Sequence, residues 1–350
     1  MKITAKDLYG MFESSGIFER LIGSGDVEVT DIAPVEECSQ SDLVFIGNKN
    51  YIRNLKGDPA VAVVSEDVLK KIGDPEYTVI VARNVNLAHA VIKQKFVDRD
   101  IRDEGWERVH PSAVVHESVR VPESTHIGPN AVVGRGVSLG DNVVIMANSV
   151  VEWGATVGDG TVIHPNVVLG YNCHVGRDCI LKSGCVIGAE GFGFAQDAHG
   201  HNHRIPQTGN VVLGDRVVIG ANDTIDRATY GTTLIKDRVV FDTLCHIGHN
   251  CEIGEDSIII SMTGISGSTK LGKRVICTGK TGMLDHLNIA DDAVFLHRAT
   301  VLTDIKEPGA YAGTPLLPLQ TYFRNTKAIA TAHEMKKRIQ ELEKKVEQLS

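Results

Sequence analysis

The sequence predicts a mainly β protein: a left-handed parallel β-helix of hexapeptide repeats, preceded by a small α/β domain and followed by a C-terminal α-helix. The first observation behind this fold class is an apolar residue at every sixth position over residues 109–187, without a miss. The same phase resumes over residues 213–225 and 235–301. The second observation is that Gly often follows the repeated residue, and a small or β-branched residue often stands four places after it.

A period of six residues fits neither an α-helix nor a single strand. It fits a short strand and a corner, with three such sides closing one coil of a β-helix. The apolar residue and the small residue four places later then point inward, while Gly and Asn supply the backbone freedom that corners need. The 29 hexads give about nine to ten coils. At roughly 4.8 Å a coil, the prism would be on the order of 40 Å tall.

The N-terminal segment, residues 1–105, lacks the hexad phase. Strand-like runs at 43–46, 60–64 and 77–82 alternate with helix-like stretches at 5–12 and 86–96. This alternation predicts a small α/β domain. The expected β-helix then spans residues 106–310.

The C-terminal extension, residues 311–350, turns helical past Pro318. From Ala328 to Leu349, apolar residues recur with alternating steps of four and three, which is a heptad seam. The seam is short for an isolated coiled coil, so we expect it to associate because the β-helices do. Flat prism faces pack readily around a three-fold axis, and we therefore expect a homotrimer.

Composition narrows the class of protein. A chain of 350 residues should hold more than one structural unit, and 35 Gly with only 5% aromatic residues suits a narrow prism. The first ten residues contain no apolar signal core, and no apolar run is long enough to span a bilayer, so we expect a cytoplasmic protein. The net charge of −8 argues against nucleic-acid binding. Cys173, Cys179 and Cys185 are spaced by six, which predicts buried thiols rather than metal ligands.

Two inserts interrupt the hexads. The first insert lies between Ile187 and Leu213, and the second adds four residues around 229–232. Inserts in a solenoid form loops, frequently on the binding face. The first insert contains His199, His201 and His203, for which a metal site and a solvated polar loop both remain open.

The candidate catalytic residues follow from coil arithmetic. His249 comes after an inward Ile and a Gly, so it falls at a corner outside the packed interior. Gly267, eighteen residues later, brings its backbone N–H to the same corner one coil on. His286 follows two coils and one residue after His249, and Asp242 takes the corner one side before it. We expect these four residues to share one groove.

The chemistry of that set suits acyl transfer. A neutral imidazole can remove the proton of an attacking amine or hydroxyl. A carboxylate on its other nitrogen fixes the tautomer. A Gly N–H can bind the developing oxyanion, which is typically worth about 2.7–4 kcal/mol. His246, on the same stretch as His249, is a histidine to which the spacing gives no role.

The chain closely resembles the UDP-3-O-acylglucosamine N-acyltransferases of lipid A synthesis over nearly its full length. The matching stretches are GFGF at 191–194, GANDTIDRA at 220–228, FDTLCHIGHN at 241–250, GISGSTKLG at 264–272, DHLNIADD at 285–292 and AGTPLLP at 312–318. The stretch at 243–245 departs from the family, which usually has polar Asn and Gln there.

The resemblance implies transfer of an (R)-3-hydroxyacyl chain from acyl carrier protein to the 2-amino group of UDP-3-O-(3-hydroxyacyl)glucosamine. It assigns the general base to His249, supporting roles to Asp242 and His286, and the oxyanion contact to Gly267. It implies no metal and no dissociable cofactor, because the phosphopantetheine arm comes with the carrier. The product is destined for the membrane, although the chain has no apparent transmembrane segment.

The resemblance also implies that the N-terminal domain binds the uridine of the acceptor through an F-x-x-N-x-x-Y pattern. Here the pattern is Phe45, Asn48 and Tyr51. An aromatic ring can stack on uracil, and an amide can both donate to and accept from its edge. The alternative is that Phe45 only fills the core of the small domain.

The C-terminal helix offers a landing surface for an acidic carrier protein. Its basic residues outnumber the nearby glutamates; they are Lys336, Lys337, Arg338, Lys344 and Lys345. The alternative is that this helix only ties the trimer together.

Three rival functions stay open. They are an O-acyltransferase or acetyltransferase on the same prism, a zinc enzyme of the carbonic anhydrase type, and a non-catalytic trimeric scaffold. The sequence does not give the length of the acyl chain. It also leaves open whether the acceptor sugar is glucosamine or a variant with an amine at position 3.

Overall fold

The computed structural model describes residues 1–101, 105–312 and 319–348. The chain divides into two compact units, Met1–Ile101 and Arg102–Ser350. Each unit is described by itself.

The N-terminal unit is built on a five-stranded sheet in the order β2-β7-β6-β5-β4. Its strands are β2 (Phe18–Ile22), β4 (Asp31–Ile32), β5 (Asp42–Ile46), β6 (Val61–Val64) and β7 (Thr78–Ala82), and β1 (Ile3–Thr4) pairs separately with β3 (Glu28–Val29). Strands β4 to β7 are parallel, and β2 is antiparallel to β7. The three strands and two helices predicted for this segment are confirmed. Strand β2 was not predicted, because its sequence FERLI has no clean alternation.

Helices cover both faces of this sheet. They are α1 (Ala5–Glu13), α2 (Glu66–Ile72) and α3 (Val85–Phe96), with a 3-10 helix, η1 (Lys49–Asn54). One core cluster joins α1 and α3 to Val61, Val63 and Ile80, and the other joins α2 to Ala62 and Val64. All four residues of β6 are buried, as expected of a parallel strand covered on two sides.

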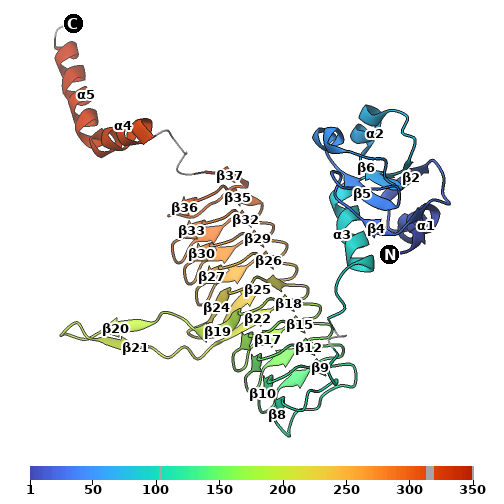
Figure 1. Ribbon diagram of the computed structural model, residues 1–350. Helices are drawn as coiled ribbons and strands as arrows, with labels where there is room; N and C mark the ends of the chain where they lie inside the picture. Colours follow the sequence, from blue (N-terminus) through green and yellow to red (C-terminus); the bar gives the residue numbers. More distant parts are fainter. Residues whose placement is uncertain (102–104, 313–318, 349–350) are drawn as a thin grey trace. The chain divides into compact units, whose positions relative to one another are not determined.

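The second unit contains the predicted parallel β-helix, whose coils stack in Figure 1. Its strands form three parallel sheets of ten, ten and eight strands in the part of the chain that the structure describes. These counts agree with the predicted nine to ten coils. We call the three sheets face 1, face 2 and face 3, in the order in which the chain visits them.

The strands of the three faces are mostly two residues long. Face 1 contains β9 (His126–Ile127), β12 (Val144–Ile145), β15 (Val162–Ile163), β18 (Ile180–Leu181), β23 (Val218–Ile219), β26 (Val240–Phe241), β29 (Ile258–Ile259), β32 (Ile276–Cys277), β35 (Ala293–Phe295) and β37 (Gly309–Tyr311). Face 2 contains β8 (Val114–Val115), β10 (Val132–Val133), β13 (Val150–Val151), β16 (Val168–Leu169), β19 (Val186–Glu190), β24 (Thr224–Arg227), β27 (His246–Ile247), β30 (Gly264–Ile265), β33 (Gly282–Met283) and β36 (Thr300–Val301). Face 3 contains β11 (Ser138–Leu139), β14 (Thr156–Val157), β17 (His174–Val175), β22 (Asn210–Leu213), β25 (Thr232–Ile235), β28 (Glu252–Ile253), β31 (Lys270–Leu271) and β34 (Asn288–Ile289).

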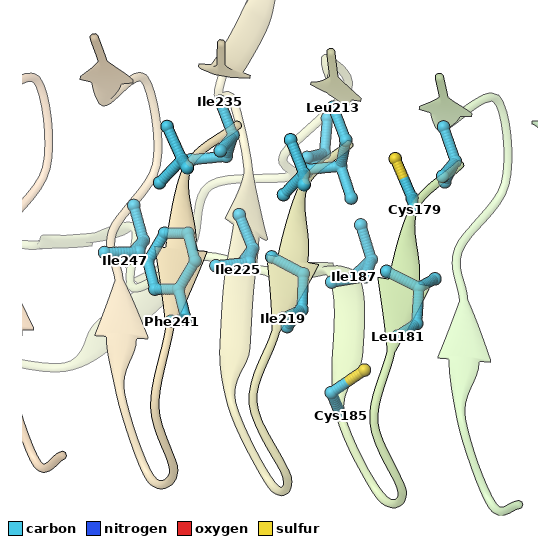
Figure 2. Packing of buried hydrophobic residues seen from close by; sticks show 14 of the residues in the cluster. Cys179, Leu181, Cys185, Ile187, Leu213, Ile219, Ile225, Ile235, Phe241 and Ile247 are labelled. Atoms are coloured by element: carbon cyan, nitrogen blue, oxygen red, sulfur yellow. The ribbon is translucent and has the colours of Figure 1, made fainter. Parts of the chain in front are cut away.

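The repeated residues form the core of the prism. Residues one coil apart pair directly, as Ile247 does with Ile265, so each coil stacks like on like. Figure 2 shows this ladder, with Cys179 and Cys185 pointing inward among the aliphatic side chains. The prediction of buried thiols is confirmed, and burial raises the pKa of Cys185 to about 12. The residues that the structure describes contain no group of three His, Cys, Asp or Glu placed to hold a metal.

The first insert continues into a β-hairpin that projects from the coils in Figure 1. The hairpin pairs β20 (Phe194–Gln196) with β21 (Asn202–Arg204) in antiparallel register. His201 and His203 both lie beside Asp197: Oδ2 of the carboxylate is 3.4 Å from His201 Nδ1 and 3.0 Å from His203 Nε2.

The C-terminal extension contains two helices, α4 (Leu319–Ala330) and α5 (Ala332–Glu347), where the heptad seam predicted a single helix. The break falls at Thr331, which has φ −102° and ψ 6°. Thr has a low helix propensity because its branched Cβ restricts the side chain in a helix. Leu349, the last seam residue, and the matching stretch 313–318 lie outside the described residues. Among the residues that the structure describes, no helix is long and apolar enough to cross a membrane.

Candidate functional site

A groove of about 500 Å³ runs along face 2 near its C-terminal end. In the earlier coils, valines stand at the outward position of each strand, at Val132, Val150 and Val168. In β30 and β33 this position is Gly264 and Gly282, and a Cβ built on either would meet no atom within 4 Å. The two glycines therefore open a furrow in the surface of face 2.

His249 stands at the corner between face 2 and face 3, where the furrow begins. A Cβ on Gly267 would lie 2.8 Å from both Cε1 and Nε2 of the ring, and a Cβ on Gly191 would lie 3.0 Å from Cβ of His249. The His249 side chain therefore packs against glycine backbone from the next coil and from the first insert. Any side chain at 267 would displace the ring. The backbone N–H of Gly267 donates no hydrogen bond to the described residues.

Asp242 does not join His249 within one chain. It follows β26 at the corner between faces 1 and 2, and its carboxylate accepts a hydrogen bond from Ser261 Oγ. This bond, helped by the backbone N–H of Thr243, lowers the pKa of Asp242. The neighbour of His249 Nδ1 is instead Asn250 Oδ1, at 3.1 Å. The expectation that Asp242 shares the groove of His249 is therefore not met within a single chain.

His286 reaches the site only through its backbone. Its N–H donates to the carbonyl oxygen of Gly267 at 3.0 Å, so it supports the peptide that packs against His249. Its ring bonds instead to Asp285, with 2.8 Å between Nδ1 and Oδ2. The His286 side chain is not among the residues that line the groove.

Sequence reasoning missed a second histidine in the groove. His246 Nε2 lies 3.0 Å from Oδ2 of Asp226, whose side chain is only 6% exposed. The hydrogen bond to Asp226 raises the pKa of His246. The signal lay in the second insert: it lengthens this coil so that Thr224 pairs with His246, twenty-two residues on, and Asp226 continues the same strand.

A pocket of about 920 Å³ lies within the N-terminal unit and is lined by the three residues of the predicted uridine pattern, among others. Phe45 is half-buried and packs on the ring of His89, with 4.4 Å between ring centroids. Burial lowers the pKa of His89, and the charge of Lys93 adds to the effect. Asn48 Oδ1 accepts from the backbone N–H of Asn50 at 2.9 Å and so caps η1. Tyr51 is 54% exposed.

Comparison with known proteins identifies relatives over the whole chain. A UDP-3-O-acylglucosamine N-acyltransferase of Methylococcus capsulatus is 53% identical over 351 aligned positions, which cover 100% of this chain and 99% of the relative. A protein of the same name from Delftia acidovorans is 38% identical, covering 93% of this chain and 92% of the relative. Residues 108–191 also match a family described as the GMPPB C-terminal domain.

Solved structures to which the chain is similar include an Arabidopsis UDP-N-acetylglucosamine acyltransferase. It is 22% identical, has a TM-score of 0.49, and covers 62% of this chain and 76% of its own. A Campylobacter jejuni UDP-N-acetylglucosamine acyltransferase is also 22% identical, with a TM-score of 0.44, and covers 56% of this chain and 68% of its own.

With a parallel β-helix, a histidine at a corner and these sequence relatives, the protein is an acyltransferase. Given 53% identity along its full length, the chain belongs to the UDP-3-O-acylglucosamine N-acyltransferase family.

Proposed function

We propose that this chain transfers an (R)-3-hydroxyacyl group from acyl carrier protein to the 2-amino group of UDP-3-O-(3-hydroxyacyl)glucosamine. The observation that carries the proposal is the packing of the His249 ring against the backbone of Gly267 at the head of an open furrow. A base, a backbone N–H and room for an apolar chain meet there.

In the proposed reaction the acceptor amine attacks the thioester carbonyl of the donor, and His249 takes the proton that the amine loses. The carbonyl oxygen becomes an oxyanion, to which the N–H of Gly267 donates. When the tetrahedral intermediate collapses, the C–S bond breaks and the imidazolium returns the proton to the departing thiolate. The reaction then balances without a metal or a dissociable cofactor, since the carrier brings its own phosphopantetheine arm.

The donor's acyl chain would lie in the furrow over Gly264 and Gly282. Their missing side chains leave space, and exposed apolar residues line the same groove: Phe192 is 83% exposed and Leu284 48% exposed. The furrow supports a long apolar substituent better than the short acetyl group of the rival acetyltransferase function.

The acceptor's uridine would bind in the N-terminal pocket. Phe45 offers a ring, Asn48 keeps its Nδ2 free of the cap that occupies Oδ1, and Tyr51 is exposed at the pocket. Phe45 also packs within the core cluster of α1 and α3, so the binding and core interpretations of this residue are compatible.

A homotrimer is supported by the chemistry of the three faces. Outward positions on faces 1 and 2 carry exposed apolar side chains, at Val114, Val132, Ile180, Val240 and Ile258. Outward positions on face 3 are mostly polar: Ser138, Thr156, His174, Glu252, Lys270 and Asn288. Helix α5 adds an exposed apolar stripe of Met335, Ile339, Leu342 and Val346. Exposed apolar side chains that gather on particular faces are typical of an interface.

Roles in the proposed reaction remain for Asp242, for His286 and for the basic residues of α5. Asp242 stands at the corner between the two apolar faces, so in a trimer it would lie at the boundary with a neighbouring subunit. His286 would contact an anionic group of a substrate, because its ring is exposed and its backbone N–H is bonded to the Gly267 carbonyl oxygen. The basic residues of α5 would dock the acidic carrier; they are Lys336, Lys337, Arg338, Lys344 and Lys345.

The decisive experiment is a mass-spectrometric product assay with a panel of hydroxyacyl carriers and with amino and hydroxyl acceptors, including the 3-amino sugar. We expect an amide product with the amino acceptor. A product only with the hydroxyl acceptor would favour the O-acyltransferase, and no product with any pair would favour a scaffold.

His249→Ala should lower turnover by roughly 10²- to 10⁴-fold, the range for a lost general base, without changing the oligomeric mass. His286→Ala should be milder. Near-full activity of His249→Ala at saturating substrate would remove the assigned base.

A further inference from the structure

The side-chain amide of Asn250 is fixed in one orientation by the second insert. Its Oδ1 accepts from the backbone N–H of Thr229 at 3.0 Å, and its Nδ2 donates to the carbonyl oxygen of Tyr230 at 2.9 Å. Rotating the amide by 180° would set the NH₂ group against an N–H and the oxygen against a carbonyl. Donor and acceptor chemistry alone therefore decides which atom is the oxygen.

That oxygen also faces His249. Asn250 Oδ1 lies 3.1 Å from Nδ1 of the imidazole. An amide oxygen only accepts, so this contact is a hydrogen bond when Nδ1 carries the ring proton. In the neutral ring the lone pair is then on Nε2. Nε2 is one of the two ring atoms that a Cβ built on Gly267 would approach most closely. The basic nitrogen therefore lies at the head of the furrow.

The group that orients Asn250 is itself held by buried polar contacts. Thr229 Oγ1 donates to Gln207 Oε1 at 2.7 Å, and Gln207 is 1% exposed. Arg227, also 1% exposed, donates to the carbonyl oxygens of Gly188 at 2.9 Å and Gly209 at 3.1 Å, near the two ends of the first insert. Buried networks of this kind hold their members in one arrangement, because an unpaired member is costly.

We infer that Asn250 is a positioning residue that holds His249 in the Nδ1–H tautomer, and that the second insert orients its amide. The effect of Asn250 on catalysis rests on the proposed role of His249 as base. The tautomer of His249 does not depend on that role. The role corresponds to the carboxylate of a catalytic triad. A neutral amide orients the ring in the same way without adding a negative charge beside it. Within one chain it replaces Asp242, whose carboxylate is bonded to Ser261.

Nitrogen NMR of the full chain labelled with ¹⁵N-histidine tests this directly. The His249 signals are identified by their loss in His249→Ala. At a pH where the ring is neutral, we expect a proton on Nδ1 and none on Nε2.

Asn250→Gly removes the acceptor without backbone strain, because Asn250 has a φ of 61° and Gly adopts that conformation freely. We expect the Nε2–H tautomer to appear and kcat/KM to fall by about 10- to 100-fold, the range found when a group that orients a metal-bound histidine is removed. The matched control is Asn130→Gly, another corner Asn with a φ of 56°, which should change neither.

Asn250→Asp loses the donor to the Tyr230 carbonyl oxygen but keeps an acceptor for Thr229 and His249, so the tautomer should be retained. The added charge should move the acidic limb of the pH profile to higher pH, because a carboxylate stabilises the imidazolium. An unmoved acidic limb would show that the side chain at 250 does not contact His249 Nδ1.

A bare Nδ1 in the wild-type protein would overturn the inference, and so would an unchanged tautomer in Asn250→Gly. The proposed function fails by a different result. If the tautomer is as inferred but His249→Ala remains fully active, the base assignment is wrong and the positioning of the ring stands.

Discussion

The imidazole of His249 lies so close to the backbone of Gly267 that a Cβ at 267 would stand 2.8 Å from Cε1 and Nε2. Real Cβ atoms do not approach other atoms so closely, so Gly267→Ala should push the ring out of position. A misplacement of about 1 Å can cost 10²-fold in rate, and we expect a loss of about that size in kcat.

The control for Gly267→Ala is Gly10→Ala, at a position in α1 where a Cβ meets no atom within 4 Å. That variant should keep full activity. Steady-state kinetics on both variants checks the prediction, and wild-type turnover by Gly267→Ala would contradict the proposed contact.

The furrow predicts an ordered change in donor preference. Gly264→Val should exclude long acyl chains most strongly, and Gly282→Val, one coil further from His249, should admit chains longer by about four methylenes, since a coil rises roughly 4.8 Å. Neither new side chain should disturb the fold, because no atom lies within 4 Å of either Cβ.

Values of kcat/KM across a series of acyl carriers measure this shift. Each methylene should be worth about 1–3 kcal/mol at the limit of the groove. A uniform loss for all chain lengths, or an inverted order of the two variants, would show that the chain lies elsewhere.

A substitution at Asn48 can distinguish nucleotide binding from the local folding of η1. Asn48→Asp keeps an oxygen to cap η1 but loses both amide donors, so it should raise KM for the nucleotide-sugar by about tenfold, the worth of one or two hydrogen bonds. Phe45→Ala should also raise this KM, through loss of stacking. Because uridine is remote from the reacting amine, kcat should change little. An unchanged acceptor KM in both variants would mean that this pocket does not bind the nucleotide.

The basic residues of α5 should govern encounter with the carrier. Changing Lys336, Lys344 and Lys345 to Glu should raise KM for the acyl carrier, most at low ionic strength, because exposed charges act mainly on association. The KM for the nucleotide-sugar should stay the same, and light scattering should show an unchanged mass. Equal effects on both substrates with loss of the oligomer would favour a role in assembly alone.

Asp223 should give stability a distinctive pH dependence. It is fully buried between the N–H groups of Gly220 and Cys245, and burial raises its pKa to about 6. A carboxyl group with a folded pKa above its unfolded value near 3.9 binds its proton more tightly in the native state. Asp223 should therefore contribute on the order of 3 kcal/mol to the free energy of unfolding. This contribution should be fully present below about pH 4 and lost as the pH rises through about 6.

Asp223→Asn should flatten the fall in the thermal midpoint between these pH values, at fixed protein concentration. Asparagine also loses one of the two backbone bonds, so the slope is the informative quantity rather than the absolute midpoint. An identical slope in both proteins would show that Asp223 does not titrate in this range.

Periodicity made the β-helix predictable, because every coil repeats the same local choice of inward apolar residue and flexible corner. The corner of His249 and its contact with Gly267 followed from counting eighteen residues. Strand β2 and the break at Thr331 did not follow, since neither leaves a periodic signal of its own.

The sequence by itself determined the stacking of coils, the burial of the thiols and the position of the candidate base, because these depend on a repeat that is local and regular. Only the tertiary structure decided which groups surround that base. Asp226 meets His246, and Asn250 meets Thr229, because inserts of irregular length change which residues lie side by side. Asp242, one corner away, bonds to Ser261 instead. Side-chain partners across an irregular loop depend on how the loop folds back on the coils, and a repeat cannot encode that.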